Sequence, residues 1–341
     1  MKSSKNIIIT WLILVALTVT IQILLGGYVR LTRSGLSMYD WHVVHGIIPP
    51  LTEESWQETF ENYKQTPEYK HINVGMTLDE YKLIYFREYN HRILGRLTGL
   101  IFVVPFFIFL FTKIIPFRKS YLYMLIGLLF AAQGVLGWYM VKSGLVDQPY
   151  VSHYRLAAHL LMAFMILALV VWKIMDNLTT FQQLTFTLIK SKSFRWSLVF
   201  FIILGLQITY GAFVAGLKAG HVSNTFPLMF GYLLPPNLFS SDMPVMLNLF
   251  QNSVTVHFIH RWLAFFVFLF SIMAYLDLKK KKIGKAIFLP ILVALQIILG
   301  LTVIWMNVPV SVALIHQGGA VLVFSAFIML LHRRAAIDTN A

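Results

Sequence analysis

The chain has 341 residues, of which 58% are hydrophobic and 12% are charged. A soluble domain carries about 25% charged residues, so the composition excludes an ordinary soluble enzyme. Cysteine is absent, which excludes disulfides, thiolate metal sites, cysteine nucleophiles and covalent c-type heme attachment. The net charge of +14 would point to nucleic acid in a soluble protein, but here the basic residues follow a membrane topology and no nucleic-acid partner is expected.

Apolar runs of about 20 residues recur along the chain, which is the length that crosses a hydrocarbon core of about 30 Å. Because lipid offers the backbone no hydrogen-bond partner, each run must be helical. The first run is longer than a signal-peptide core and has no clear cleavage site, so we interpret it as a retained span. The sequence therefore predicts an all-α membrane protein with eight transmembrane helices, at about 6–29, 88–112, 120–141, 153–174, 195–217, 254–276, 286–306 and 311–332.

The basic residues predict the orientation of these spans. The side that holds both termini carries 16 basic residues and three acids, whereas the other side carries 12 basic residues and 11 acids. The positive-inside rule then places both termini in the cytoplasm or the equivalent compartment. On this side, His332 near the end of the last span is expected to be structural.

Two loops on the outer side are long, at about 30–87 and 218–253. Loops of this length in a compact protein are usually functional or have structure of their own. Within the first, residues 53–70 space Trp56, Phe60 and Tyr63 as an amphipathic helix does. We expect a helix that lies along the membrane surface, with a plain solvated loop as the alternative.

A pattern Q-x-x-x-G recurs near the outer end of each odd-numbered span. Glutamine and glycine four residues apart share one helix face, where glycine allows close approach and glutamine can bond across the contact. The loops after the first and fifth spans also share G-L and P-P segments. We therefore predict two related halves, 1–176 and 194–341, that form pseudo-symmetric four-helix bundles with one orientation. The four matches are Gln22/Gly26, Gln133/Gly137, Gln207/Gly211 and Gln296/Gly300.

One histidine lies near the outer end of each even-numbered span: His91, His159, His260 and His316. Polar residues inside a membrane usually face the bundle interior and mark functional sites. Four at similar depth supply two axial pairs, one in each half, and pairs of this kind on facing helices suit b-type heme. The alternative is that each histidine is an ordinary hydrogen-bonded residue of the bundle.

Charged residues accompany these histidines. Arg92 and Arg261 directly follow the first histidine of each pair, where they would neutralise the anionic heme propionates. Glu88 lies three residues before His91 on the same helix face, so its carboxylate could take a proton during oxidation chemistry. The alternative for Glu88 is an interfacial residue paired with Arg87 or Arg92.

His257 stands at the position in the second half that Glu88 takes in the first. It lies beside His260 or replaces it as a ligand, and the role of His153 is also open. Because only one pocket has a carboxylate, we expect one heme to be chemically changed and the other to be a fixed cofactor. The remaining outer-loop histidines are expected at the surface, with metal binding left open: His42, His45, His71 and His221.

Several segments resemble heme A synthases of the mitochondrial and proteobacterial type, and the resemblance runs over nearly the whole chain. Some bacterial members carry a cysteine pair in the first outer loop, which this chain lacks. The similar segments are 26–37 (GGYVRLTRSGLS), 46–51 (GIIPPL), 67–69 (PEY), 88–96 (EYNHRILGR), 154–160 (YRLAAHL), 258–261 (FIHR) and 316–317 (HQ).

This resemblance implies an oxidoreductase that converts the C8 methyl group of heme O to a formyl group by two successive hydroxylations. The product, heme A, would serve terminal oxidases. His260 and His316 would hold a resident heme b, and His91 and His159 the substrate heme, with Glu88 as the carboxylate important for the chemistry. The implied location is the bacterial cell membrane or the mitochondrial inner membrane.

The implied partners are a heme O synthase and terminal-oxidase assembly, while the electron acceptor and a homo-oligomer are left open.

Two other functions fit part of the pattern. A membrane cytochrome b that only transfers electrons explains two histidine pairs but not the asymmetric Glu88. A transporter built from two parallel repeats would bind no heme.

Overall fold

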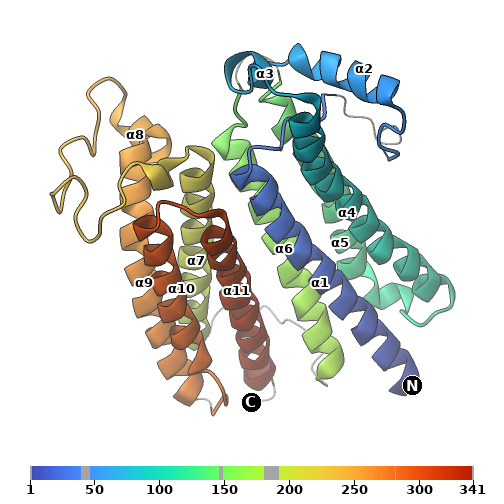
Figure 1. Cartoon of the computed structure of the whole chain (residues 1–341). Coiled ribbons are helices and arrows are strands. Elements are labelled where there is room, and N and C mark those ends of the chain that lie inside the picture. The colour runs from blue at the N-terminus through green and yellow to red at the C-terminus, as the bar shows by residue number, and fades with distance from the viewer. Residues whose placement is uncertain (1, 40–46, 146–148, 180–191, 281, 340–341) are drawn as a thin grey trace. The chain divides into compact units, whose positions relative to one another are not determined.

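The computed structural model describes residues 2–39, 47–145, 149–179, 192–280 and 282–339 (Figure 1). Within these ranges eight helices are long and apolar enough to cross a membrane. This finding confirms the predicted all-α membrane fold. The chain divides into two compact units, residues 14–166 and residues 1–13 with 167–341. Each unit contains one of the predicted histidine pairs, and the duplication into halves 1–176 and 194–341 stays a prediction.

The long helices begin within about one turn of the predicted starts, except the second. They are α1 Lys2–Leu31, α4 Leu78–Phe111, α5 Tyr121–Lys142, α6 His153–Leu178, α7 Lys192–Gly216, α9 Ser253–Lys280, α10 Phe288–Trp305 and α11 Val310–Thr339. Shorter helices lie in the connections: α2 Glu53–Lys64, α3 Pro67–His71 and α8 Val245–Gln251, with 3₁₀ turns η1 Phe117–Lys119 and η3 Ala219–His221.

Helix α4 begins at Leu78, ten residues before the predicted start of that span. A capping box starts it: Glu80 N–H donates to the hydroxyl of Thr77, and Thr77 N–H donates to the carboxylate of Glu80. The first turns are too polar to register as a membrane span, yet they remain helical because their apolar residues are buried. Hydropathy therefore located the span but missed the extension of the same helix beyond it.

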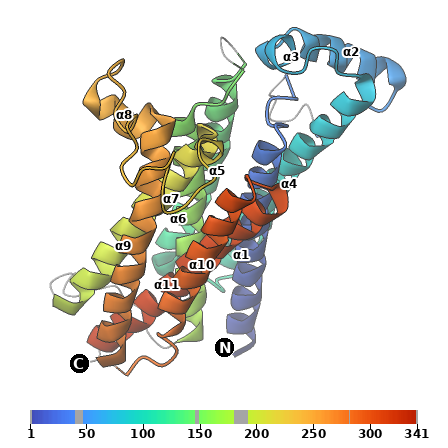
Figure 2. The ribbon, with the colours of Figure 1, turned by 60° about the vertical axis from the view of Figure 1, so that its left-hand side comes forward.

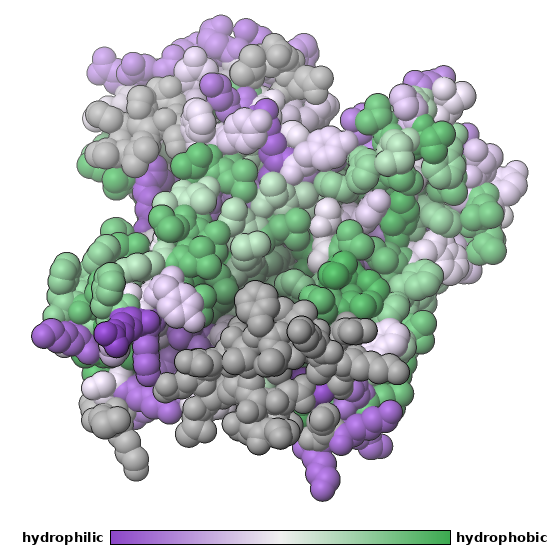
Figure 3. Space-filling view, turned by 180° about the vertical axis from the view of Figure 1, so that it is seen from behind, coloured by the Kyte–Doolittle hydropathy of each residue, from purple (hydrophilic) through white to green (hydrophobic). Residues whose placement is uncertain are grey.

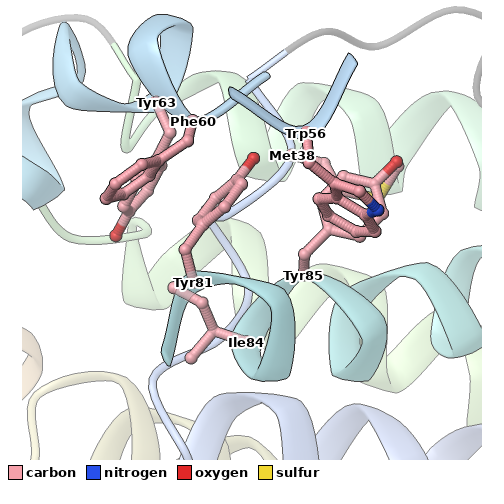
Figure 4. Close-up of a cluster of buried hydrophobic side chains, with 7 residues drawn as sticks. All are labelled: Met38, Trp56, Phe60, Tyr63, Tyr81, Ile84 and Tyr85. Atoms are coloured by element: carbon pink, nitrogen blue, oxygen red, sulfur yellow. The ribbon is translucent and has the colours of Figure 1, made fainter. Parts of the chain in front are cut away.

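Helices α2 and α3 lie over the N-terminal extension of α4 (Figures 1 and 2). Figure 4 shows the apolar face of α2 directed toward Tyr81 and Tyr85 of α4. The ring centroids of Tyr63 and Tyr81 are 4.9 Å apart, and those of Trp56 and Tyr85 are 5.0 Å apart. Aromatic pairs in such geometries contribute about 0.5–1.5 kcal/mol beyond the area that they bury.

The predicted helix at 53–70 is thus confirmed over Glu53–Lys64, and Pro67 starts a second short helix. Its apolar face is covered by protein, because Trp56, Phe60 and Tyr63 are buried, while its position along the membrane surface stays a prediction. The periodicity of a segment shows which face is apolar, but not whether lipid or protein covers that face.

In the other unit, α7 packs on α9, and α10 packs on both α9 and α11. Near its C-terminal end α11 places a buried His332, whose Nε2 lies 2.9 Å from the Asp176 carboxylate on α6. Lys173 donates to the other oxygen of Asp176 over 2.8 Å. These contacts agree with the structural role expected for His332.

Candidate functional site

Each Q-x-x-x-G motif lies against one of the four predicted histidines. In every case the glutamine Nε2 donates to the main-chain carbonyl of the histidine on the following long helix. The four distances are 2.9 Å for Gln22 to His91, 3.0 Å for Gln133 to His159, 3.1 Å for Gln207 to His260 and 2.7 Å for Gln296 to His316. The motif therefore does more than bring helices together, because it fixes the turn from which each imidazole extends.

The glycine of each motif makes room for the imidazole ring. A Cβ at Gly211 would lie 3.1 Å from Cε1 of His260, and a Cβ at Gly300 would lie 3.0 Å from Cε1 of His316. The same contact at Gly137 is 3.1 Å to Cε1 of His159. Van der Waals contact between carbon atoms is optimal at about 3.5–4.0 Å, so a side chain here would displace the ring. We call each glutamine–glycine pair a histidine seat.

The seat of His91 differs from the others in one respect. Here the nearest ring atom is Nε2, at 3.0 Å from a Cβ placed on Gly26, whereas at the other three seats it is Cε1. The His91 ring is therefore turned relative to the other three. His91 is one of the two ligands, with His159, that the sequence resemblance assigns to the substrate heme.

The four seats bring the histidines together as two pairs. His91 lies close enough to His159 for the two rings to influence each other electrostatically, and His260 has the same relationship to His316. In the part of the chain that the structure describes, Nδ1 of His159, His260 and His316 is buried without a hydrogen-bond partner. Buried polar atoms are nearly always bonded. Histidines that lie in pairs, with backbone bonds to their carbonyls and glycine contacts that orient their rings, fit axial ligation of heme iron.

Glu88 is buried, with 3% of its surface exposed, in a network in the N-terminal third of α4. Its carboxylate accepts hydrogen bonds from the Ser37 hydroxyl over 2.8 Å, from the Met38 N–H over 2.9 Å and from Arg92 Nε over 3.0 Å. Arg92 also donates to the Met38 carbonyl over 3.2 Å. This ion pair fastens the segment after α1 to α4, and we call it the Glu88 clamp.

The other unit contains a clamp of the same design. Arg261 Nε donates to Nε2 of His257 over 3.0 Å, and its Nη atoms donate to the carbonyls of Ser223 and Thr225 over 2.6 and 2.7 Å. His257 thus takes the place of Glu88, while His260 occupies the seat. This arrangement favours His260 over His257 as the ligand.

Both arginines that the sequence predicted for heme propionates are buried in these clamps. Their role in neutralising propionates stays a prediction, and so does proton transfer by Glu88. The pairing of Glu88 with Arg92, which the sequence left open, is present. The loop partners Ser37 and Ser223 were not predicted from the sequence, although Ser37 lies in the loop segment after α1 that resembles the one after α7.

The other histidines lie apart from the seats. The ring of His153 packs on Tyr154 with centroids 4.0 Å apart. His71 and His221 are exposed, as predicted, while His42 and His45 lie outside the described residues. Among the residues that the structure describes, no three histidine or carboxylate side chains gather to hold a metal ion.

Comparison with known proteins identifies the chain's relatives. Residues 9–328 match the family described as cytochrome oxidase assembly protein, COX15-CtaA. The chain is 42% identical over 341 residues to the heme A synthase of Parvibaculum lavamentivorans, covering 98% of this chain and 96% of that protein. It is 40% identical to the heme A synthases of Wolbachia pipientis subsp. Culex pipiens, covering 93% and 94%, and of Rickettsia africae, covering 95% and 97%. The chain therefore belongs to the COX15-CtaA family of cytochrome oxidase assembly proteins.

Proposed function

We propose that this protein is a heme A synthase, an oxidoreductase that converts heme O to heme A. The observation that carries the proposal is the presence of four histidine seats in two pairs. They lie in a chain about 40% identical to heme A synthases over nearly its full length. The reaction oxidises the C8 methyl group of heme O to a formyl group through an alcohol, by two successive hydroxylations.

His260 and His316 would hold the resident heme b, whose iron supplies electron-transfer chemistry when it is bound. Each seat fixes its ring through a backbone bond and a glycine contact, so the ligands are oriented before the heme arrives. Such preorganisation suits a cofactor that stays in place.

His91 and His159 would hold the substrate heme. Glu88 lies three residues before His91, so its carboxylate is on the face of α4 that presents the ligand. The Glu88 clamp fixes this carboxylate in a buried position beside the loop backbone of Ser37 and Met38. In this proposal Glu88 accepts the proton that is released as the methyl group is oxidised.

The remaining features of the proposal concern the setting of the enzyme. Both termini face the cytoplasm or the mitochondrial matrix, because most basic residues lie on that side of the spans. The enzyme receives heme O from a heme O synthase and supplies heme A to terminal-oxidase assembly. Lateral entry of this hydrophobic substrate from the bilayer and direct handover from its synthase both fit the fold.

Coexpression with a heme O synthase tests the function. Hemes extracted from these membranes should include heme A, which carries a formyl group and is distinguished by its absorption spectrum and mass. Unconverted heme O in the presence of folded, heme-loaded protein would refute the proposal. A protein that only transfers electrons would give that result, and a transporter would give no heme spectrum at all.

Alanine variants test the assignment of the two pockets. His260→Ala should lose the resident heme, whereas His91→Ala should keep that heme and lose conversion. The matched control is His71→Ala, because His71 is an exposed histidine of the loop helix α3. The reverse pattern would exchange the roles of the two pockets.

A further inference from the structure

The two long loops of this protein differ in the number of charged residues that they carry. The α1–α4 loop, residues 32–77, buries the aromatic side chains of α2 and exposes many charged side chains, with apolar ones such as Leu51 and Val74 among them. The α7–α9 loop, residues 217–252, buries polar side chains and exposes large apolar ones. Because both loops belong to one chain, the charged first loop provides an internal comparison for the second.

The interior of the α7–α9 loop is built from hydrogen bonds. Asn248 is fully buried, and its Oδ1 accepts from Ser240 N–H over 2.8 Å while its Nδ2 donates to the Met243 carbonyl over 3.1 Å. Asn252 also donates to Asn248, over 2.8 Å. The loop is tied to α9 where the Thr255 hydroxyl donates to the Leu238 carbonyl, and α8 packs against α9. The loop therefore lies beside the first turns of a span and has a defined shape.

This shape directs apolar side chains outward. Met229 and Tyr232 exchange backbone hydrogen bonds of 2.8 and 3.0 Å around a tight turn, whose central residues Phe230 and Gly231 both have positive φ. Figure 3 shows apolar side chains over much of this loop. Leu234 is 67% exposed and Met246 is 65% exposed, and Phe230, Leu233 and Val245 are also exposed.

Charge is nearly absent from this surface. Between residues 219 and 252, Asp242 is the only aspartate, glutamate, lysine or arginine. Sites that bind another protein usually have a polar rim and are enriched in arginine. An apolar surface without basic residues, next to the end of a membrane span, instead fits acyl chains together with the aromatic belt of the interface.

We propose that the α7–α9 loop inserts into the lipid leaflet beside the outer end of α9, with Phe230, Leu233, Leu234, Val245 and Met246 among the acyl chains. The occupant of this surface is lipid rather than protein. Insertion depends on apolar contact, so it is the same in zwitterionic and anionic membranes. This inference goes beyond the proposed catalytic function and does not depend on it.

Insertion of this loop would also affect the second histidine pair, because the loop is bonded to the clamp beside that pair. Ser223 and Thr225, whose carbonyls accept from Arg261, belong to the inserted loop. The lipid leaflet and the His257–Arg261 clamp are thus connected by one continuous, internally bonded segment. The loop would hold the clamp at a fixed depth in the membrane.

The absence of cysteine makes a direct test possible. Single cysteines would replace Leu234 and Met246, with Val74→Cys and Leu51→Cys as matched controls, since these apolar residues of the α1–α4 loop are 72% and 79% exposed. Each variant of the full-length protein would carry a nitroxide label in bilayers of phosphatidylcholine alone and with added phosphatidylglycerol. Electron paramagnetic resonance would then compare collisions with oxygen, which concentrates in lipid, and with a water-soluble nickel chelate.

The labels at Leu234 and Met246 should collide mainly with oxygen in both lipid compositions, and those at Val74 and Leu51 mainly with the nickel chelate. Nickel access at Leu234 and Met246 equal to that of the controls would overturn the proposal, because the loop would lie in water. Protection from both reagents would also overturn it, since another protein or a second copy would then cover the loop. The readout needs no heme, so it is independent of the test of enzymatic activity.

Discussion

Arg261 Nε donates a hydrogen bond of 3.0 Å to Nε2 of His257, four residues earlier on the same helix. In the other unit Arg92 Nε donates a bond of the same length to the carboxylate of Glu88, also four residues earlier. The two clamps hold loops in the same way but carry different charges. Glu88 neutralises Arg92, whereas among the described residues Arg261 is bonded to an imidazole and two carbonyls and to no carboxylate. The two clamps therefore have the same hydrogen-bond geometry, but they place different net charges beside the two histidine pairs.

Removing the Glu88 carboxylate should destabilise the protein strongly. Glu88→Ala leaves the buried Arg92 without its counter-ion, and breaking a buried pair in this way costs about 3–5 kcal/mol. The matched control is Glu61→Ala, since Glu61 forms an exposed ion pair with Lys64, and such pairs contribute at most about 1 kcal/mol. Chemical unfolding in detergent would measure both, and equal losses would show that the Glu88 clamp is not structural.

The charge difference between the clamps should affect the heme of the second pocket. His257→Glu would neutralise Arg261 and place a negative charge beside His260, which favours the oxidised iron. The reduction potential of the resident heme should therefore fall. A redox titration followed by visible absorption measures this change, with His257→Gln as the uncharged control. A potential that falls equally in both variants would mean that packing, not charge, is responsible.

The histidine seats should tolerate no side chain at their glycines. Gly211→Ala places a Cβ 3.1 Å from the ring of His260, and overpacking of this kind costs about 1–3 kcal/mol. We expect a lower heme content and an altered low-spin spectrum in the purified protein. Gly205→Ala lies on the same helix, and its Cβ would meet nothing within 4 Å. If Gly205→Ala lost as much heme as Gly211→Ala, helix propensity rather than ring contact would explain the effect.

The cluster between α2 and α4 should weaken at alkaline pH. Burial and the nearby Glu68 raise the pKa of Tyr63, whose hydroxyl donates to that carboxylate over 3.1 Å. An unfolded tyrosine loses its proton near its ordinary pKa of about 10, so the stabilising contribution is complete below this pH and decreases as pH rises above it. Thermal unfolding at increasing alkaline pH should show a smaller decrease for Tyr63→Phe than for the unaltered chain. Tyr232→Phe, which removes an exposed hydroxyl, should behave as the unaltered chain does.

Hydropathy was enough to find every span, because lipid requires long uninterrupted apolar helices and leaves few alternatives. It missed the first ten residues of α4, because their polar side chains lower the hydropathy of a segment that is nevertheless helical and capped by Thr77 and Glu80. It also could not say that the apolar face of α2 packs on α4, since the same face would suit lipid. Only the burial of Trp56 and Tyr63 decided between protein and membrane.

The sequence by itself determined the membrane class, the eight helices, the four histidines at equivalent depths and the recurring Q-x-x-x-G motif. The tertiary structure decided what these repeats do. Whether Gln207 bonds to the backbone of His260, or Gln22 to that of His91, depends on the register between helices that are more than 40 residues apart in the chain. Such register is set by the many small packing contributions along the whole contact between two helices. The spacing of residues within one helix does not contain this information.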